Sequence, residues 1–404
     1  MSGDTVQQAG FVKLKAFNFL MYGAIGIYST FFALYLKHIG LTTIEIGALL
    51  SGGPVVSLIA NPIWAYWSDR LNNNRLILII ASIGAFAVMQ GIFLIQSESL
   101  IYGAMLVFFI FQSPLFIQSN SLILSVIAGT GYKFGSFRQW GSLGWAVSAA
   151  AAGPVIGKIG IGQLWIIFDV VMILSILFAF TLPRGSGSRK QDSFSNAGYR
   201  RVFMNPQFLA LLLIGILVSV PNIINQTFVG LHIKDLGGSD SAVGWSVFAT
   251  AILEAPVFLL LDRYLKNDTK PMVVWMAVVS LLYSVRWLLM SLTGNPLGII
   301  AIQLMHCVTF GAYYYIGTRL TTRLIPHEYL STGQAVYGLS WSGASGIIAG
   351  TLGGWMFQEL GTRTLYQISA GVTLLGMVAF LVMFKMMKTP SSSASAQAFS
   401  ISED

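Results

Sequence analysis

One arginine and one tryptophan stand at a spacing that can form a ligand site. Arg138 lies within or at the mouth of an apolar stretch, where an arginine is costly and usually functional. Trp145 follows two helical turns later, so both side chains can face one cavity. A guanidinium and an indole suit a sugar, and they equally suit a carboxylate with an aromatic body. The alternative is a pair of anchors at the membrane interface.

A second group of ionisable residues lies in the other half of the chain. Arg286 and His306 fall in successive apolar stretches, and a histidine can exchange a proton near neutral pH. Glu254 is the clearest acidic candidate inside an apolar stretch of this half. A packing role for His306 and a role at a helix end for Glu254 stay open. Asp169 and Asn120 are weaker polar candidates.

The composition places these residues in a membrane protein. Of the 404 residues, 55% are hydrophobic and 9% are charged, whereas a soluble domain is roughly 25% charged. This excludes a soluble enzyme, a nucleic-acid-binding module and a disordered scaffold. The sequence contains no Walker loop, zinc-ligand spacing or nucleophile motif, so we expect neither an enzyme nor a metal or other cofactor.

Continuous apolar stretches of about 20 residues predict transmembrane helices. The expected fold is an all-α membrane protein with twelve transmembrane helices in two six-helix, pseudo-symmetric bundles. Residues 1–183 would form the first bundle, 184–205 a basic linker, 206–388 the second bundle and 389–404 a disordered tail. The predicted spans are 12–36, 43–67, 75–95, 99–127, 134–158, 163–182, 206–233, 240–263, 270–292, 296–324, 329–357 and 363–387.

The basic residues predict the orientation of the chain. The net charge is +8, and most of the 23 lysines and arginines fall on the side that holds both termini and the linker. The positive-inside rule makes this side cytoplasmic. We therefore expect a multi-pass monomer in the cell membrane, with both termini in the cytoplasm and the lipid bilayer around it, that binds no nucleic acid.

The two predicted bundles repeat each other in sequence. Residues 36–40 with Gly47 match residues 233–237 with Gly244 at a constant offset of 197. Homologous six-helix halves in parallel orientation place a binding site between them, near the membrane midplane. This is the architecture of a transporter, and its expected partner is a small-molecule substrate.

A charged pair also recurs in both halves. Asp69-Arg70 matches Asp262-Arg263 at an offset of 193, at the predicted cytoplasmic ends of the second and eighth spans. An aspartate there can cap a helix or pair with a basic residue of a neighbouring helix. We expect these four residues to act as a conformational latch, and a pair of solvated loop charges is the alternative.

The whole chain resembles the major facilitator superfamily, in the branch that holds lactose permease and the phenylpropionate-type permeases. Residues 26–36 are similar to the first helix of lactose permease. Residues 62–71 resemble the superfamily's loop motif after helix two, with Ala65 in place of its leading glycine. Residues 138–145, Arg138-x-x-Gly-x-x-Gly-Trp145, resemble the segment that holds the galactosyl ring.

The resemblance assigns roles to the candidate residues. It implies that Arg138 and Trp145 bind substrate, with Asn120 and Tyr28 nearby. Asn120 stands where the family carries an acidic residue. The resemblance also matches Arg286 and His306 to the family's proton-coupling arginine and histidine.

The pattern departs from the family at the proton-coupling carboxyl. The family's glutamate falls on Thr309 and its lysine on Gln303, so Glu254 is the expected proton carrier. We expect a proton-coupled symporter that imports a small polar metabolite, most consistent with a sugar, by alternating access. The alternatives are uptake of a small aromatic carboxylate, a proton-antiport exporter, and a receptor that transports nothing.

Overall fold

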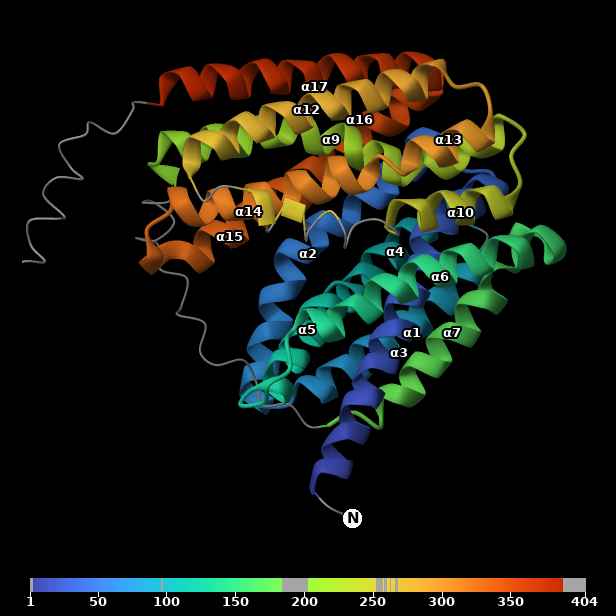
Figure 1. Ribbon diagram of the computed structural model, residues 1–404. Coiled ribbons are helices and arrows are strands. Elements are labelled where there is room, and N and C mark those ends of the chain that lie inside the picture. The colour runs from blue at the N-terminus through green and yellow to red at the C-terminus, as the bar shows by residue number, and fades with distance from the viewer. Residues whose placement is uncertain are drawn as a thin grey trace, which may run out of the picture.

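The structure is a computed structural model that describes residues 3–95, 97–183, 203–251, 257, 260–261, 263–265 and 268–387. Within these ranges the chain is almost entirely helical and forms no strand. Figure 1 shows the first half, blue to green, in the lower part of the view and the second half, yellow-green to red, in the upper part. The predicted all-α fold class is confirmed.

The first half contains the helices of the first six predicted spans. These segments are apolar over lengths that can span a bilayer. They are helical because a helix pairs its own backbone polar groups, which lipid cannot do. The helices are α1 (Gly3–His38), α2 (Thr43–Leu71), α3 (Asn74–Leu94), α4 (Glu98–Gln112), α5 (Pro114–Ile127), α6 (Gly135–Ile159), the short 3₁₀ turn η1 (Ile161–Gln163) and α7 (Leu164–Ala179).

The second half repeats this order. Its described elements are α9 (Pro206–Asp235), α10 (Asp240–Ala251), α12 (Thr269–Leu292), α13 (Pro296–Gln303), η2 (Cys307–Gly311), α14 (Ala312–Leu324), η3 (His327–Tyr329), α15 (Leu330–Gly338), η4 (Leu339–Ala344), α16 (Ser345–Glu359) and α17 (Gly361–Met386). Across the described residues, nine helical segments are long and apolar enough to cross a membrane. Residues 184–202 of the predicted linker at 184–205 and the predicted tail at 389–404 lie outside the described residues.

The fourth predicted span is broken where the prediction had one continuous helix. Pro114 lacks a backbone N–H, so α4 stops before Ser113 and α5 starts at the proline. The carbonyl of Ile110, which Pro114 cannot bond, accepts a hydrogen bond from the indole of Trp64 over 2.8 Å. The carbonyl of Ile110 therefore keeps a hydrogen-bond donor despite the break.

Two later spans contain a π-helical turn instead of a regular helix. The turn η2 directly follows His306, and η4 joins α15 to α16. Such turns shift the side chains that follow them around the helix axis and recur at functional sites. Both turns contribute residues to the cavities described below.

The second helix extends farther than predicted. α2 continues to Leu71 and ends at Asn72, whose φ of 48° is left-handed. Asparagine tolerates this conformation better than most residues do. Asp69 and Arg70 therefore belong to the last helical turn, and the loop predicted around them is displaced to Asn72.

Glycines bring the two halves into backbone contact at one end of the molecule. A β-carbon on Gly350 of α16 would lie 2.6 Å from the carbonyl oxygen of Gly47 of α2, and one on Gly153 of α6 would lie 2.5 Å from that of Asp240 of α10. Gly153 and Gly350 stand at the same offset of 197 as the sequence repeat. Small residues permit such close approach of membrane helices.

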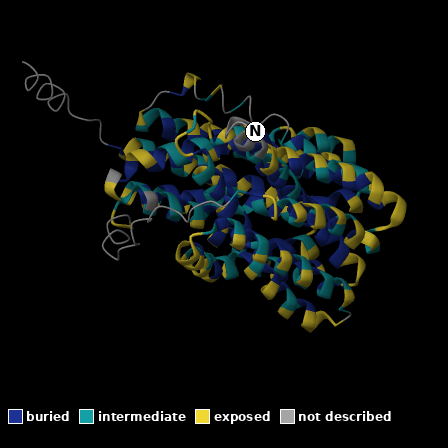
Figure 2. Ribbon diagram, turned by 90° about the horizontal axis from the view of Figure 1, so that it is seen from below, coloured by how far each residue is buried: buried dark blue, intermediate teal, exposed yellow. Residues whose placement is uncertain are grey.

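The opposite end of the molecule is more open. Of the described residues in α14 and α15, few approach the first half, whereas α2 packs along α16 and α6 along α10. Figure 1 shows the halves diverging toward the side of α14, α15 and α5. We call the glycine-packed side, which holds Thr43 and Asp240, the closed end, and the other side the open end. Figure 2 shows buried residues in the middle of the molecule and exposed ones at its margin.

Candidate functional site

A cavity of about 440 Å³ lies between the two halves. We call it the arginine chamber. Helices α1, α5 and α6 line it from the first half, and α9, α10, α13 and η2 line it from the second. Its polar lining residues are Tyr22, Ser29, Thr30, Asn120, Arg138, Ser142, Trp145, Asn225, Gln226, Thr250, Gln303 and His306. The structure thus brings four of the predicted residues from distant parts of the sequence to one cavity: Arg138, Trp145, Asn120 and His306.

Arg138 is held over an aromatic ring at the edge of this chamber. Its guanidinium carbon lies 4.3 Å from the ring centre of Tyr22, and Nη1 lies 3.4 Å from the hydroxyl of Ser142. A cation stacked on a tyrosine keeps its in-plane N–H groups available to a ligand. Gly141 makes room for this stack, because a β-carbon there would lie 2.8 Å from Tyr22 and 3.0 Å from Arg138 Nη1.

Trp145 and Asn120 complete the first-half wall. Gly26 of α1 lies against the backbone of Trp145, where a β-carbon would come within 3.0 Å, so the indole sits close to α1. The amide oxygen of Asn120 is buried and has no hydrogen-bond partner in the described part of the chain. It is an acceptor that a ligand hydroxyl or amine can satisfy.

Arg286 lies one layer behind the second-half wall and is fully buried. Its Nη1 lies 3.2 Å from Nδ1 of His306 and donates to the hydroxyl of Thr309 over 3.1 Å, while Nη2 donates to the amide oxygen of Gln303. The guanidinium also lies 4.7 Å from the ring centre of Trp287. Gln303 and His306 therefore connect the chamber to a buried cation.

The same polar network extends to α9 and α17. The amide of Asn225 donates to the side-chain oxygen of Gln303 over 3.4 Å, and the hydroxyl of Tyr366 donates to the side-chain oxygen of Asn225 over 3.0 Å. Asn225 and Gln303 line the chamber. Polar chains of this kind inside a membrane bundle mark ligand or proton pathways more often than packing alone.

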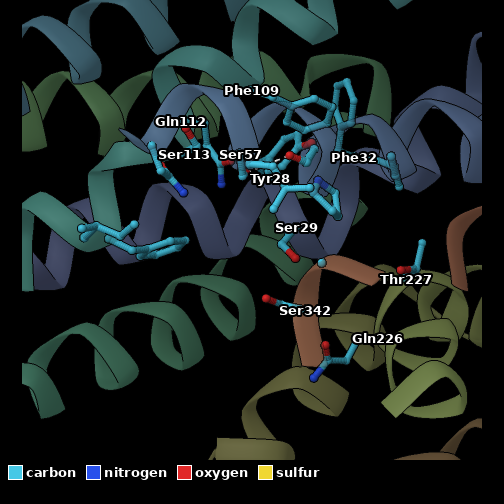
Figure 3. Close-up of a pocket in the computed structure, with 18 of the residues that line it drawn as sticks. Tyr28, Ser29, Phe32, Ser57, Phe109, Gln112, Ser113, Gln226, Thr227 and Ser342 are labelled. Atoms are coloured by element: carbon cyan, nitrogen blue, oxygen red, sulfur yellow. Dashed lines mark hydrogen bonds between the residues drawn. The ribbon is translucent and has the colours of Figure 1, made fainter. Parts of the chain in front are cut away.

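Tyr28 lies in a neighbouring cavity of about 550 Å³. We call it the neutral chamber (Figure 3). It shares the lining residues Ser29, Phe116 and Gln226 with the arginine chamber, so the two cavities are adjacent. The ring of Tyr28 packs against Phe32 and Phe108, each 4.9 Å away between ring centres.

The remaining predicted residues lie away from these cavities or beyond the described ranges. Asp69 and Arg70 are exposed at the open end, where Arg70 donates to the hydroxyl of Tyr66 over 3.1 Å. The guanidinium of Arg263 lies 5.6 Å from the ring centre of Tyr264. Glu254 and Asp262 fall outside the described residues.

Several cavity residues were not found by sequence reasoning. Tyr22, Gln226 and Gln112 are uncharged, so their residue types alone do not distinguish them from packing residues, and the same holds for Gly141, which makes room for the stack of Arg138 on Tyr22. The internal repeat was an available signal for Gln226, because it stands at the offset of 197 from Ser29 and both line the chambers. Gln112 sits at the Ser113 break, which its proline neighbour could have indicated.

A family model described as the MFS_1 like family matches residues 11–368. The chain belongs to this family.

Proteins with related sequences are named as transporters. The maltose permease of Geobacillus stearothermophilus is 24% identical over 376 residues, which cover 92% of this chain and 94% of the permease. The probable 3-phenylpropionic acid transporter of Escherichia coli (strain K12) is 25% identical over 352 residues, which cover 85% of this chain and 90% of that protein.

Solved structures agree on the fold. The nucleoside transporter NupG superposes with a TM-score of 0.78 at 17% identity, over 93% of this chain and 99% of that one. This family member is therefore an integral membrane protein with the major facilitator fold. Because its family and relatives are permeases and not enzymes, it is a transporter that handles a small-molecule substrate.

Proposed function

We propose that this transporter is a proton-coupled symporter that imports a sugar by alternating access. The observation that carries the proposal is the meeting of Arg138, Trp145 and Asn120 with His306 in one chamber between the halves. A midplane site between two repeats is the arrangement on which alternating access operates. The protein would release its substrate through the open end. The open end would then close while the closed end opens.

The chemistry of the arginine chamber supports a polyhydroxylated substrate. Trp145 offers a flat apolar face to a pyranose ring. The fork of Arg138 and the amides of Asn120 and Gln226 offer donors and acceptors to its hydroxyls. The named sugar permease among the relatives is consistent with this substrate class.

A small aromatic carboxylate is the second candidate substrate. The observation in its favour is the charge of the arginine chamber: Arg138 lines it, and none of its described lining residues is acidic. A carboxylate would then be the natural counter-ion of Arg138. The relative named as a 3-phenylpropionic acid transporter supports this candidate.

The proton would be exchanged in the second half. His306 faces the chamber and contacts Arg286, and Glu254 follows three residues after Ala251, which lines the same chamber. An imidazole in contact with a buried guanidinium can change its protonation as substrate binds and leaves, and a carboxyl in the same half can take up the proton. In this scheme Glu254 carries the proton, while Arg286 and His306 set when it is released.

A pH-electrode assay on liposomes tests the proposal. Purified protein is supplied with sugars or aromatic carboxylates, and proton movement is recorded for the wild type, Arg138→Ala and the exposed control Arg363→Ala. Sugar-evoked proton uptake that is lost only in Arg138→Ala would support the proposal. Proton movement with carboxylates alone would select the second candidate, and sugar uptake without proton movement would overturn the coupling.

The carrier role of Glu254 has its own test. Glu254→Gln should still exchange labelled substrate across the membrane but should no longer accumulate it against a gradient. Normal accumulation by this variant would remove Glu254 from the coupling scheme. Expression and monodispersity of the purified variant provide the control for folding.

A further inference from the structure

We propose that the neutral chamber is a second ligand compartment, which binds an uncharged, hydroxyl-bearing ring of the same substrate that occupies the arginine chamber. The inference rests on the proposed function and specifies the size and polarity of the substrate. Each chamber alone, at about 550 Å³ and about 440 Å³, is large enough for a small-molecule site. Ser29, Phe116 and Gln226 line both, so the chambers are adjacent, and a molecule of two rings that passes these residues would place one ring in each.

The two chambers are copies of each other under the internal repeat. At the offset of 197, residues of the neutral chamber fall on residues that line the arginine chamber. The pairs are Leu50 with Val247, Gly53 with Thr250, Pro54 with Ala251, Leu339 with Ser142 and Ser342 with Trp145. The neutral chamber is thus the symmetry partner of the site that contains Arg138, and not an accidental gap in packing.

The repeat also shows where the two chambers differ. The position equivalent to Arg138 at this offset is Ala335, which removes the cation from the neutral side. At an offset of 194, which relates Phe116 to Phe310, Gln112 is equivalent to His306. An uncharged amide therefore replaces a titratable ring, and none of the described residues lining the neutral chamber is charged.

Unpartnered polar atoms indicate that the ligand of the neutral chamber carries hydroxyl groups. The hydroxyl of Tyr28 and the amide oxygen of Asn61 are buried and have no hydrogen-bond partner among the residues that the structure describes, and both residues line the chamber. Tyr28 is 8% exposed. A purely apolar ring would leave both groups unpaired, which is unfavourable. A hydroxylated ring can satisfy both and still pack on the aromatic side chains.

The arrangement of the other side chains supports the same ligand. Figure 3 shows Ser57, Gln112 and Ser113 grouped beside Tyr28, with Ser342 and Gln226 on the facing side of the cavity. The break at Pro114 and the π-turn η4 position Gln112 and Ser342, respectively. Phe109 adds an apolar face to this wall.

Cysteine labelling provides a matched test, because the chain has one cysteine and it is buried. In a Cys307→Ser background, Ser342→Cys reports on the neutral chamber and Ser142→Cys on the arginine chamber. N-ethylmaleimide labelling of each variant in detergent is measured without ligand, with glucose and with maltose. We expect maltose to protect both positions and glucose to protect Ser142→Cys alone.

The outcomes separate this inference from the proposed function. Protection of Ser142→Cys by both sugars, with Ser342→Cys labelled equally throughout, would overturn the second compartment and leave the sugar site intact. Protection of Ser342→Cys alone would overturn the role of the arginine chamber and keep the second compartment. Labelling that neither sugar changes at either position would overturn both.

A transport measurement checks the same point without labelling. Gln112→Leu should raise the half-saturation concentration for maltose by about tenfold, the effect of losing one to two hydrogen bonds. The half-saturation concentration for glucose should change by no more than about twofold, which is less than the loss of one such hydrogen bond would cause. An equal effect on both sugars would contradict a compartment for the second ring.

Discussion

Arg286 donates a hydrogen bond from Nη1 to Nδ1 of His306, across 3.2 Å in the interior of the second half. A guanidinium has no acceptor atom, so Nδ1 must be the acceptor and the ring proton must sit on Nε2. Protonation of Nδ1 would place two donors face to face and break the contact. The geometry therefore links the protonation of His306 to the position of Arg286, which also holds Gln303 at the chamber wall.

This link predicts different behaviour for two substitutions of His306. In His306→Gln the new amide oxygen can accept from Arg286, whereas in His306→Leu an N–H of the buried guanidinium is left unpaired. An unpaired buried donor costs about 1–3 kcal/mol, and more if it is charged. We expect His306→Leu to unfold at a clearly lower temperature in detergent than His306→Gln. Equal melting temperatures would show that the hydrogen bond contributes no stability.

A methyl group at Gly141 should disturb the substrate site without unfolding the protein. The new β-carbon would lie 2.8 Å from Tyr22 and 3.0 Å from Arg138 Nη1, so the stack must shift. We expect Gly141→Ala to raise the half-saturation concentration for substrate by about tenfold or more, because displacing one charged hydrogen-bond donor is worth that much. Gly157→Ala, in the same helix and with nothing within 4 Å, is the control.

The closed end should open when its glycine packing is disturbed. In Gly350→Ala the methyl group would lie 2.6 Å from the carbonyl oxygen of Gly47, and overpacking of this kind costs about 1–3 kcal/mol. The substitution should favour the conformation that is open at this end. Maleimide labelling of Ser51→Cys, whose serine is 9% exposed, should become faster.

Gly338→Ala provides the matched control for this experiment, since no atom lies within 4 Å of its added methyl group. It should leave the labelling rate of Ser51→Cys unchanged. A faster rate in the control as well would mean that loss of glycine flexibility, and not the clash at Gly350, opens the molecule.

The latch proposed for Asp69 predicts a kinetic effect and not a folding effect. Asp69 is exposed at the open end, so its carboxylate contributes little to the stability of this conformation. If it pairs with a basic residue when that end closes, Asp69→Asn should slow turnover with little change in substrate affinity or melting temperature. A change in affinity with unchanged turnover would contradict the latch. Asp69→Glu, which keeps the charge, should retain most of the turnover.

The sequence by itself determined the all-helical fold class, the internal repeat and the residue types available for binding. Apolar runs of membrane-spanning length specify helices locally, because a backbone in lipid must pair its own polar groups. An arginine and a tryptophan two turns apart must share a helix face, so Arg138 and Trp145 were predictable as a pair. The offset of 197 likewise follows from the residues alone.

Only the tertiary structure decided which of these side chains meet. The rotation of each helix about its axis depends on long-range packing, such as the glycine contacts between α2 and α16. The tertiary structure places Tyr28 and Arg138 in different chambers, although both were predicted at one site. The break at Ser113 could be expected from Pro114, but the indole of Trp64 that bonds the freed carbonyl of Ile110 comes from another helix, so this pairing depends on the tertiary structure.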